Sequence, residues 1–217
     1  MAKVGVVLSG CGVYDGAEIH EATLTLFFLD REGAEIICMA PDISQMDVMD
    51  HIKGEPMAET RNVLNESSRI ARGNIKNMKD VKAGDLDALV FPGGFGAAKN
   101  LCNFAVKGPD CTAHPEVERL IKEMHAAKKP IGFICIAPVL AARVLGTFNP
   151  QLTIGNDRGT AEAIEKMGGK HIDSTVDNAV VDMKNKVVTT PAYMLGPTIS
   201  NVAMGIEKLV NVLLRLS

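Results

Sequence analysis

The chain has 217 residues, 47% of them hydrophobic and 23% charged, with a formal net charge of −3. This length suits one domain over residues 1–217, able to bury roughly 70–75% of its unfolded surface. Basic residues are scattered rather than gathered in a stripe, and no apolar run reaches the ~20 residues of a membrane span. We therefore expect no nucleic-acid or membrane partner, and a small, weakly charged ligand instead.

The cysteines bear on redox chemistry and location. There are five, an odd number, and none lies in a CxxC pair or at a zinc-like spacing with histidine. We expect neither a disulfide framework nor a structural metal. Residues 1–8 show no signal-peptide pattern and no Arg-rich leader, which predicts a cytoplasmic protein.

Strands and helices alternate along the chain. In order, the sequence predicts a strand over 4–8, a helix capped by Asp15 and stopped by Gly33, a strand over 35–40, irregular chain over 42–60, a helix over 62–72, a strand over 86–91, a helix over 116–127, a strand over 131–134, a helix over 137–144, a helix over 159–167, a hairpin of strands 179–182 and 186–190, and a helix over 197–215. This order is typical of an α/β fold with a largely parallel sheet and helices on both faces. Ligands of such folds bind at the carboxyl ends of the strands.

Cys135 follows a short apolar strand and precedes a helix-compatible stretch, so its thiol lies at a sharp strand-to-helix turn. A nucleophile on such an elbow projects above the sheet edge, where backbone N–H groups and a helix N-terminus stabilise an anion. We interpret Cys135 as the reactive residue.

A pair of glycines follows the neighbouring predicted strand. Gly93 and Gly94 can direct backbone N–H groups at a developing oxyanion, and the amide of Ile136 can reach the same point. The alternative is a tight strand-to-helix turn that holds no ligand. The loop Gly10-Cys11-Gly12 lacks the later glycine of a dinucleotide-binding motif, so we expect no nucleotide cofactor.

Two acidic residues share one helix face near the same sheet edge. Glu18 and Glu21 are three residues apart, and a buried acid beside Cys135 could share a proton with the sulfur. Acidic residues also favour the first helical turn for electrostatic reasons alone. We expect Glu18 to face solvent and Glu21 to point inward.

The remaining candidates are weaker. Each of the five histidines is interpreted as a surface or structural residue, and Cys11 either as a packed hydrophobe or as a thiol that resolves an oxidised Cys135. The side-chain directions of Asp15, Glu18, His20 and Glu21 do not converge, so we predict no metal site there.

Six motifs carry a resemblance to a known family. They are Leu8-Ser-Gly-Cys-Gly-Val-Tyr-Asp-Gly16, Glu18-Ile-His-Glu21, Arg61-Asn-Val-Leu64, Phe91-Pro-Gly-Gly-Phe-Gly-Ala-Ala-Lys-Asn100, Cys135-Ile-Ala-Pro138 and Thr189-Thr-Pro-Ala-Tyr-Met194. Together they resemble the ThiJ/PfpI superfamily of the class I glutamine amidotransferase-like fold, and more narrowly its ElbB-like branch. The motifs span almost the whole chain.

The resemblance implies a flavodoxin-like three-layer sandwich, a nucleophilic cysteine at Cys135, a cysteine-facing acid at Glu21 and a homodimer. Members of the ElbB-like branch are described as weak glyoxalases that need no glutathione, and are linked to early isoprenoid biosynthesis. The chain departs from the wider amidotransferase pattern because neither Ile136 nor the segment 152–157 supplies a histidine. Asn156 or Asp157 could take a polar role there.

The expected function is therefore conversion of methylglyoxal or glyoxal to the 2-hydroxy acid through a Cys135 hemithioacetal, without metal or organic cofactor. The expected partner is a small dicarbonyl or aldehyde. The alternative is a non-catalytic redox-sensing or accessory protein linked to isoprenoid metabolism. A hydrolase or amidotransferase partner is the least favoured reading, because a dedicated histidine base is missing.

Overall fold

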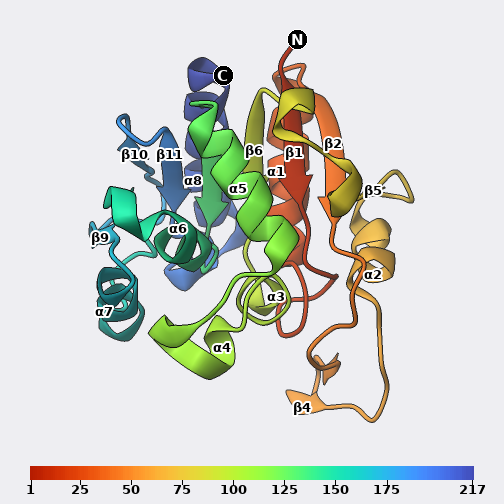
Figure 1. Ribbon diagram of the computed structural model, residues 1–217. Coiled ribbons are helices and arrows are strands. Elements are labelled where there is room, and N and C mark those ends of the chain that lie inside the picture. Colours follow the sequence, from red (N-terminus) through yellow and green to blue (C-terminus); the bar gives the residue numbers. More distant parts are fainter.

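A computed structural model describes residues 1–217 and contains a central sheet of seven strands in the order β10-β11-β7-β6-β1-β2-β5 (Figure 1). Every neighbouring pair is parallel except β10 and β11. The strands are β1 (Lys3–Val7), β2 (Glu35–Ala40), β5 (Lys76–Asn77), β6 (Ala88–Phe91), β7 (Ile131–Ile134), β10 (Val180–Asp182) and β11 (Val187–Thr190).

Eight α-helices accompany the sheet. They are α1 (Ile19–Arg31), α2 (Val63–Ile70), α3 (Phe95–Lys99), α4 (Phe104–Lys107), α5 (Pro115–Ala126), α6 (Pro138–Leu145), α7 (Arg158–Lys166) and α8 (Ile199–Leu216). Short 3-10 turns cover Met78–Asp80, Ala83–Asp85, Gly108–Asp110, Gly146–Phe148 and Ala192–Met194.

Helices cover both faces of the sheet. One apolar core joins the sheet to α5 and α6, and a second joins the opposite face to α1 and α8. Because both faces are covered, β6, β7 and β11 are buried along their whole length. This arrangement confirms the predicted flavodoxin-like three-layer α/β fold.

The start of α1 differs from the prediction. Asp15 does not cap this helix: the cap is Glu18, whose Oε2 accepts a hydrogen bond from the N–H of Glu21 at 2.7 Å. Asp15 is instead buried in the preceding loop, where its Oδ2 accepts from the N–H of Met49 at 2.8 Å. The carboxylate of Asp15 therefore binds a distant segment, at Met49, and not the N-terminus of the helix that the local pattern predicted it would cap.

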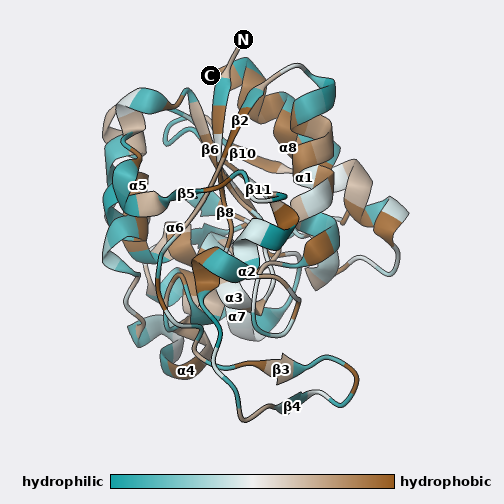
Figure 2. Cartoon of the chain, turned by 90° about the vertical axis from the view of Figure 1, so that its right-hand side faces the viewer, coloured by the Kyte–Doolittle hydropathy of each residue, from teal (hydrophilic) through white to brown (hydrophobic).

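The sequence did not predict the shortest elements. In the segment expected to be irregular, β3 (Met49–Asp50) and β4 (Glu55–Pro56) form a hairpin that projects away from the sheet (Figure 2). A second small pair joins β8 (Gln151–Leu152) to β9 (Lys170–His171) in parallel. Two-residue strands are too short to show a hydrophobic period, so the sequence pattern does not indicate them.

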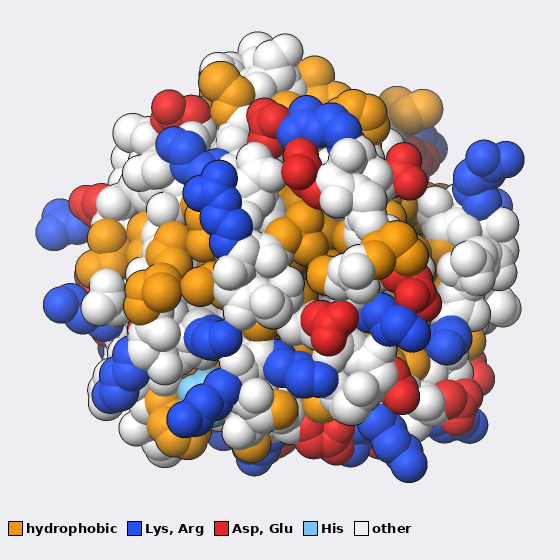
Figure 3. Space-filling view, turned by 90° about the horizontal axis from the view of Figure 1, so that it is seen from above, with side chains coloured by type: hydrophobic (Ala, Val, Ile, Leu, Met, Phe, Trp, Pro, Cys, Tyr) orange, Lys and Arg blue, Asp and Glu red, His pale blue; other side chains and the backbone are white.

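Both chain termini lie at one end of the molecule, and β1 and β11 run from there toward the opposite end (Figure 1). Seen from the terminal end, acidic and basic side chains are interspersed among apolar ones (Figure 3). None of the helices has the length and apolar character needed to cross a membrane. The carboxyl ends of the strands, where chemistry was expected, lie at the far end from the termini.

Candidate active site

Cys135 lies between the end of β7 at Ile134 and the start of α6 at Pro138. Its φ is 62°, in the left-handed region that a non-glycine residue rarely adopts. Its N–H donates to the carbonyl of Thr190 at the end of β11 at 2.9 Å, which helps to hold the turn. Such a conformation costs about 1–3 kcal/mol and persists only where the surroundings fix it. The thiol is 8% exposed.

Glu21 lies beside Cys135 and is completely buried in the first turn of α1. Its Oε2 accepts from the N–H of Gly93 at 3.0 Å and its Oε1 from the N–H of Tyr193 at 3.1 Å. The Cys135 thiol adjoins the same carboxyl group and acts to lower its pKa. Burial, followed by the charge of Glu18, raises the pKa of Glu21 to about 8. The acid therefore holds a proton at neutral pH.

Gly93 and Gly94 form the floor of the site, and the structure shows why both are glycine. A Cβ at Gly93 would lie 2.4 Å from the Cβ of Cys135 and 2.5 Å from Oε2 of Glu21. Gly94 has a φ of +92°, and a Cβ there would lie 2.4 Å from the backbone nitrogen of Glu18. A side chain at Gly93 would displace Cys135 and Glu21, and one at Gly94 would displace the backbone that precedes α1.

Backbone amides surround Cys135, and the sequence predicted that those of Gly93, Gly94 and Ile136 would stabilise an oxyanion on the substrate. The amides of Gly94 and Ile136 act on the sulfur of Cys135 and lower the pKa of its thiol. The N–H of Gly93 is already bonded to Glu21, so the expectation that it serves the oxyanion is wrong. Gly93 instead orients the acid.

The protonation of the pair follows from its surroundings. Burial raises the pKa of the Cys135 thiol well above its ordinary value, and the charge of Glu21 acts in the same direction. The amides of Gly94 and Ile136 act in the opposite direction because they stabilise the thiolate. Near neutral pH both groups are therefore protonated, and the first proton leaves the pair as the pH passes about 8.

Above Cys135 a cavity of about 340 Å³ opens toward the surface. Its lining is mostly apolar and comprises Val13, Glu18, Gly94, Phe95, Ala98, Phe104, Ala105, Cys135, Ile136, Thr160, Tyr193 and Met194. Sequence reasoning missed the side chains from α4 and α7, Phe104, Ala105 and Thr160. Phe95, Tyr193 and Met194 lie in the motifs that resemble the family, but they were not predicted to line a cavity.

Glu18 does not face solvent, contrary to expectation. It is only 9% exposed and lines the cavity. Its side chain caps α1, while its backbone N–H donates to the carbonyl of Gly93 at 3.0 Å. The contact with the Gly93 loop turns Glu18 inward, and local sequence does not reveal that contact.

Three other candidates do not line this cavity. Cys11 is half-buried; burial and the charge of Glu66 raise the pKa of its thiol. Asn156 is exposed, and Asp157 caps α7 by accepting from the N–H of Thr160 at 2.8 Å. The structure therefore brings Glu21, Gly94 and Ile136 to Cys135, and leaves these three residues elsewhere.

The histidines occupy structural positions. His20 lies nearest the cavity, because its Nδ1 is 2.7 Å from the hydroxyl oxygen of Tyr193. His114 caps α5, and His125 pairs with Asn185. No group of three or more His, Cys, Asp or Glu residues is arranged to hold a metal ion.

The model of the DJ-1/PfpI family matches residues 11–195. The chain belongs to this family. The predicted ThiJ/PfpI resemblance is thereby confirmed.

Individual relatives refine this assignment. The chain is 53% identical to the mitochondrial ES1 protein homolog of Rattus norvegicus, over 100% of this chain and 84% of that protein. It is also 53% identical, with the same coverage, to the mitochondrial glutamine amidotransferase-like class 1 domain-containing protein 3 of Homo sapiens. Both names place these relatives in mitochondria, so the prediction of a cytoplasmic location is wrong.

Solved structures show the same fold. An isoprenoid biosynthesis protein with an amidotransferase-like domain from Ehrlichia chaffeensis has a TM-score of 0.93 and 37% identity, covering 100% of this chain and 99% of that one. Glyoxalase III from Candida albicans has a TM-score of 0.64 and 16% identity, covering 98% and 97%. The latter likeness supports the fold alone.

Proposed function

We propose that this member of the DJ-1/PfpI family is a glutathione-independent glyoxalase that converts methylglyoxal or glyoxal to the 2-hydroxy acid. The observation that carries the proposal is the contact between a buried, proton-bearing Glu21 and Cys135 under the amides of Gly94 and Ile136. A thiol, a proton carrier and two N–H donors are the groups that this isomerisation needs.

The first step is addition of the Cys135 sulfur to the aldehyde carbon of the substrate. Glu21, in its ionised form, takes the thiol proton and passes it to the aldehyde oxygen, which becomes the hydroxyl of a hemithioacetal. The N–H groups of Gly94 and Ile136 stabilise the negative charge on that oxygen during attack. Carbon and sulfur form the only new heavy-atom bond.

Glu21 then moves a proton between the two substrate carbons. It removes the proton from the former aldehyde carbon, the proton of the hemithioacetal hydroxyl passes to the keto oxygen by way of an enediol, and Glu21 returns its proton to the neighbouring carbon. The product is a thioester of the 2-hydroxy acid, which one water molecule hydrolyses to release the acid and the thiol. The aldehyde carbon is oxidised and the keto carbon reduced, so no external oxidant is required.

The test is production of lactate from methylglyoxal at matched protein concentrations. We expect Cys135→Ala to abolish cysteine-dependent lactate formation and Glu21→Gln to lower its rate by about 100-fold or more. Cys38→Ala is a matched control, because Cys38 is a buried cysteine on β2 outside the cavity. Lactate formation at the wild-type rate by Cys135→Ala would contradict the proposal.

A second candidate is an accessory role in isoprenoid metabolism, favoured by the name of the isoprenoid biosynthesis protein from Ehrlichia chaffeensis. In that case Cys135 would form an adduct with aldehydes in a one-to-one ratio and release no hydroxy acid. Intact-protein mass spectrometry alongside lactate detection separates the two roles. A redox-sensing role fits less well, because peroxides react with thiolates and burial keeps Cys135 protonated.

A further inference from the structure

The chemistry of the cavity walls bears on which aldehyde the site accepts. Seven of the lining residues are aliphatic or aromatic side chains or methionine: Val13, Phe95, Ala98, Phe104, Ala105, Ile136 and Met194. Two of them are phenylalanines, on the short helices α3 and α4. A cavity of about 340 Å³ lies within the range of pockets that enclose drug-sized ligands, roughly 300–1,000 Å³. Methylglyoxal would leave most of this apolar surface without contact.

The charges around the cavity exclude anions. No lysine or arginine lines it, and its one charged side chain besides the reactive pair is Glu18. Lys99 lies close by, 5.6 Å from the centre of the Phe95 ring, but its ammonium group is held by Asp47 at 3.0 Å and by the carbonyl of Tyr14 at 2.9 Å. A carboxylate or phosphate on the substrate would therefore meet an acidic neighbour without a compensating cation.

We propose that the preferred substrates are neutral α-oxoaldehydes that carry an aryl or branched alkyl group on the keto carbon, which presupposes the glyoxalase function proposed above. The dicarbonyl end meets Cys135 and the amides of Gly94 and Ile136. The apolar group lies between Phe95 and Phe104, where aromatic rings favour tilted or offset contact with an aryl ring. Phe95 is 48% exposed and forms part of the mouth, so a ring that passes it enters an apolar channel.

The chemistry is that of the smaller substrates. Phenylglyoxal and one water molecule give mandelate: the sulfur adds to the aldehyde carbon, Glu21 moves one proton from that carbon to the next, and water cleaves the thioester. The aryl group takes no part in bond making, so its effect is confined to binding and orientation.

The experiment compares kcat/KM for phenylglyoxal, methylglyoxal and 4-carboxyphenylglyoxal. Since burial of even one additional methylene changes kcat/KM by about 10-fold or more, we expect phenylglyoxal to exceed methylglyoxal by at least about 10-fold. We expect 4-carboxyphenylglyoxal to fall at least about 10-fold below phenylglyoxal because of Glu18. Mandelate formation is measured rather than substrate loss, since phenylglyoxal also modifies arginines, and the rate with Cys135→Ala is subtracted.

A substitution in the cavity wall tests where the aryl group of the substrate binds. Phe104→Ala should lower kcat/KM for phenylglyoxal by about 10-fold while changing methylglyoxal by less than about threefold. Val106→Ala is the matched control, because it removes a similar apolar side chain from the same helix at a residue that is 67% exposed. Equal losses on both substrates with Phe104→Ala would overturn the assignment of this wall to the aryl group.

The outcomes separate this inference from the proposed function. Cysteine-dependent turnover that favours methylglyoxal over phenylglyoxal would overturn the substrate class and leave the glyoxalase standing. Absence of hydroxy acid from every substrate would overturn the glyoxalase, and the ligand class is then decided by protection of Cys135 from iodoacetamide. Stronger protection by acetophenone than by acetone or benzoate supports a neutral apolar ligand, and equal protection overturns it.

Discussion

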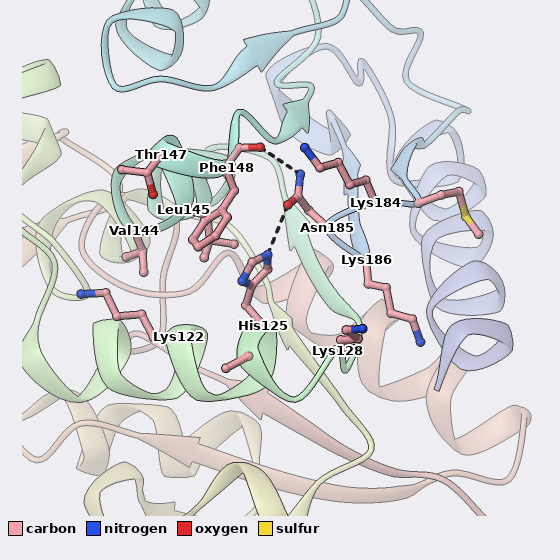
Figure 4. A pocket seen from close by; sticks show the side chains of 12 residues that line it. Lys122, His125, Lys128, Val144, Leu145, Thr147, Phe148, Lys184, Asn185 and Lys186 are labelled. Atoms are coloured by element: carbon pink, nitrogen blue, oxygen red, sulfur yellow. Dashed lines mark hydrogen bonds between the residues drawn. The ribbon is translucent and has the colours of Figure 1, made fainter.

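Two cavities lie at opposite ends of the same strands, and they differ in chemistry more than in size. The cavity at Cys135 measures about 340 Å³, whereas one at the amino ends of β7 and β11 measures about 790 Å³ (Figure 4). The larger one is lined by Lys122, His125, Ala126, Lys128, Val144, Leu145, Thr147, Phe148, Met183, Lys184, Asn185 and Lys186. By volume and by its histidine, it would rank ahead of the Cys135 cavity as a candidate for catalysis.

The polar groups of the larger cavity are bonded to one another. His125 pairs through Nε2 with Oδ1 of Asn185 at 3.2 Å, and Nδ2 of Asn185 donates to the carbonyl of Phe148 at 3.4 Å (Figure 4). The side chains of Lys122 and Lys186 extend in opposite directions, and that of Lys186 donates to the carbonyl of Leu216. At Cys135, by contrast, the backbone is strained and a carboxyl group is kept protonated. The cysteine–acid pair lies at the carboxyl ends of the strands, so its position follows strand direction rather than cavity size.

The largest expected effect comes from filling the glycine floor. Gly93→Ala places a methyl group against Cys135 and Glu21, and should destabilise the protein by about 1–3 kcal/mol and lower activity by about 100-fold. Gly84→Ala is the control, because a Cβ at Gly84 meets nothing within 4 Å. Urea denaturation and lactate formation measure both effects. Wild-type activity in Gly93→Ala would show that the acid does not need its present position.

The next effect is the pH dependence of the free energy of unfolding, which should come from Glu21 in the cavity at Cys135. Folded Glu21 holds its proton up to about pH 8, whereas the unfolded residue releases it near 4.5. The native state thus binds one more proton between these values, and the free energy of unfolding should fall as the pH rises through this window. Glu21→Gln should remove that fall.

The same group controls the reactivity of the sulfur. Alkylation of Cys135 by iodoacetamide should increase as the pH rises through about 8, where ionised Glu21 can accept the thiol proton. Because the charge of Glu21 raises the pKa of the thiol, Glu21→Gln should increase alkylation above pH 8, while His125→Gln in the larger cavity leaves the profile unchanged. An unchanged profile in Glu21→Gln would separate the acid from the thiol.

A smaller effect is expected from the larger cavity itself. His125→Ala removes the hydrogen bond to Asn185 and the contact with Phe148, whose ring centre lies 4.4 Å away. The expected cost is about 1 kcal/mol of stability, with lactate formation unchanged. A 10-fold loss of activity without unfolding would mean that this cavity communicates with Cys135.

The smallest effect concerns backbone strain. Glycine adopts the φ of 62° more readily than a residue with a Cβ, so Cys135→Gly should be about 1 kcal/mol more stable than Cys135→Ala. Both variants lack the thiol, so the difference in urea midpoint isolates the conformation. A lower midpoint for the glycine variant would indicate that the turn is not strained.

Local sequence predicted those parts of the site that depend on short runs. The apolar run 131–134 placed β7 correctly, and the helix-compatible stretch after it placed Cys135 at the turn. The pairing of Glu21 with the sulfur came from the family resemblance and from helical spacing. The first rests on features within a few residues of one another, whereas the second needed the family resemblance.

What failed depends on contacts between distant segments. Glu18 turns inward because the loop at Gly93 and Gly94 meets its backbone, and the N–H of Gly93 is taken by Glu21, 72 residues away. The wall residue Phe104 lies on a helix of four residues, too short for a periodic signal. The floor of the site was therefore more predictable than its walls.

The glycine floor also determines how this site can change over evolutionary time. A side chain at Gly93 would displace Cys135 and Glu21, and one at Gly94 would displace the backbone before α1, so few substitutions are tolerated beneath the sulfur. Phe95 and Phe104 lie on short helices at the rim and can be exchanged without touching Glu21. New substrate preferences should therefore arise by substitution of wall residues such as Phe95 and Phe104, while Cys135, Glu21 and the glycines beneath them stay unchanged.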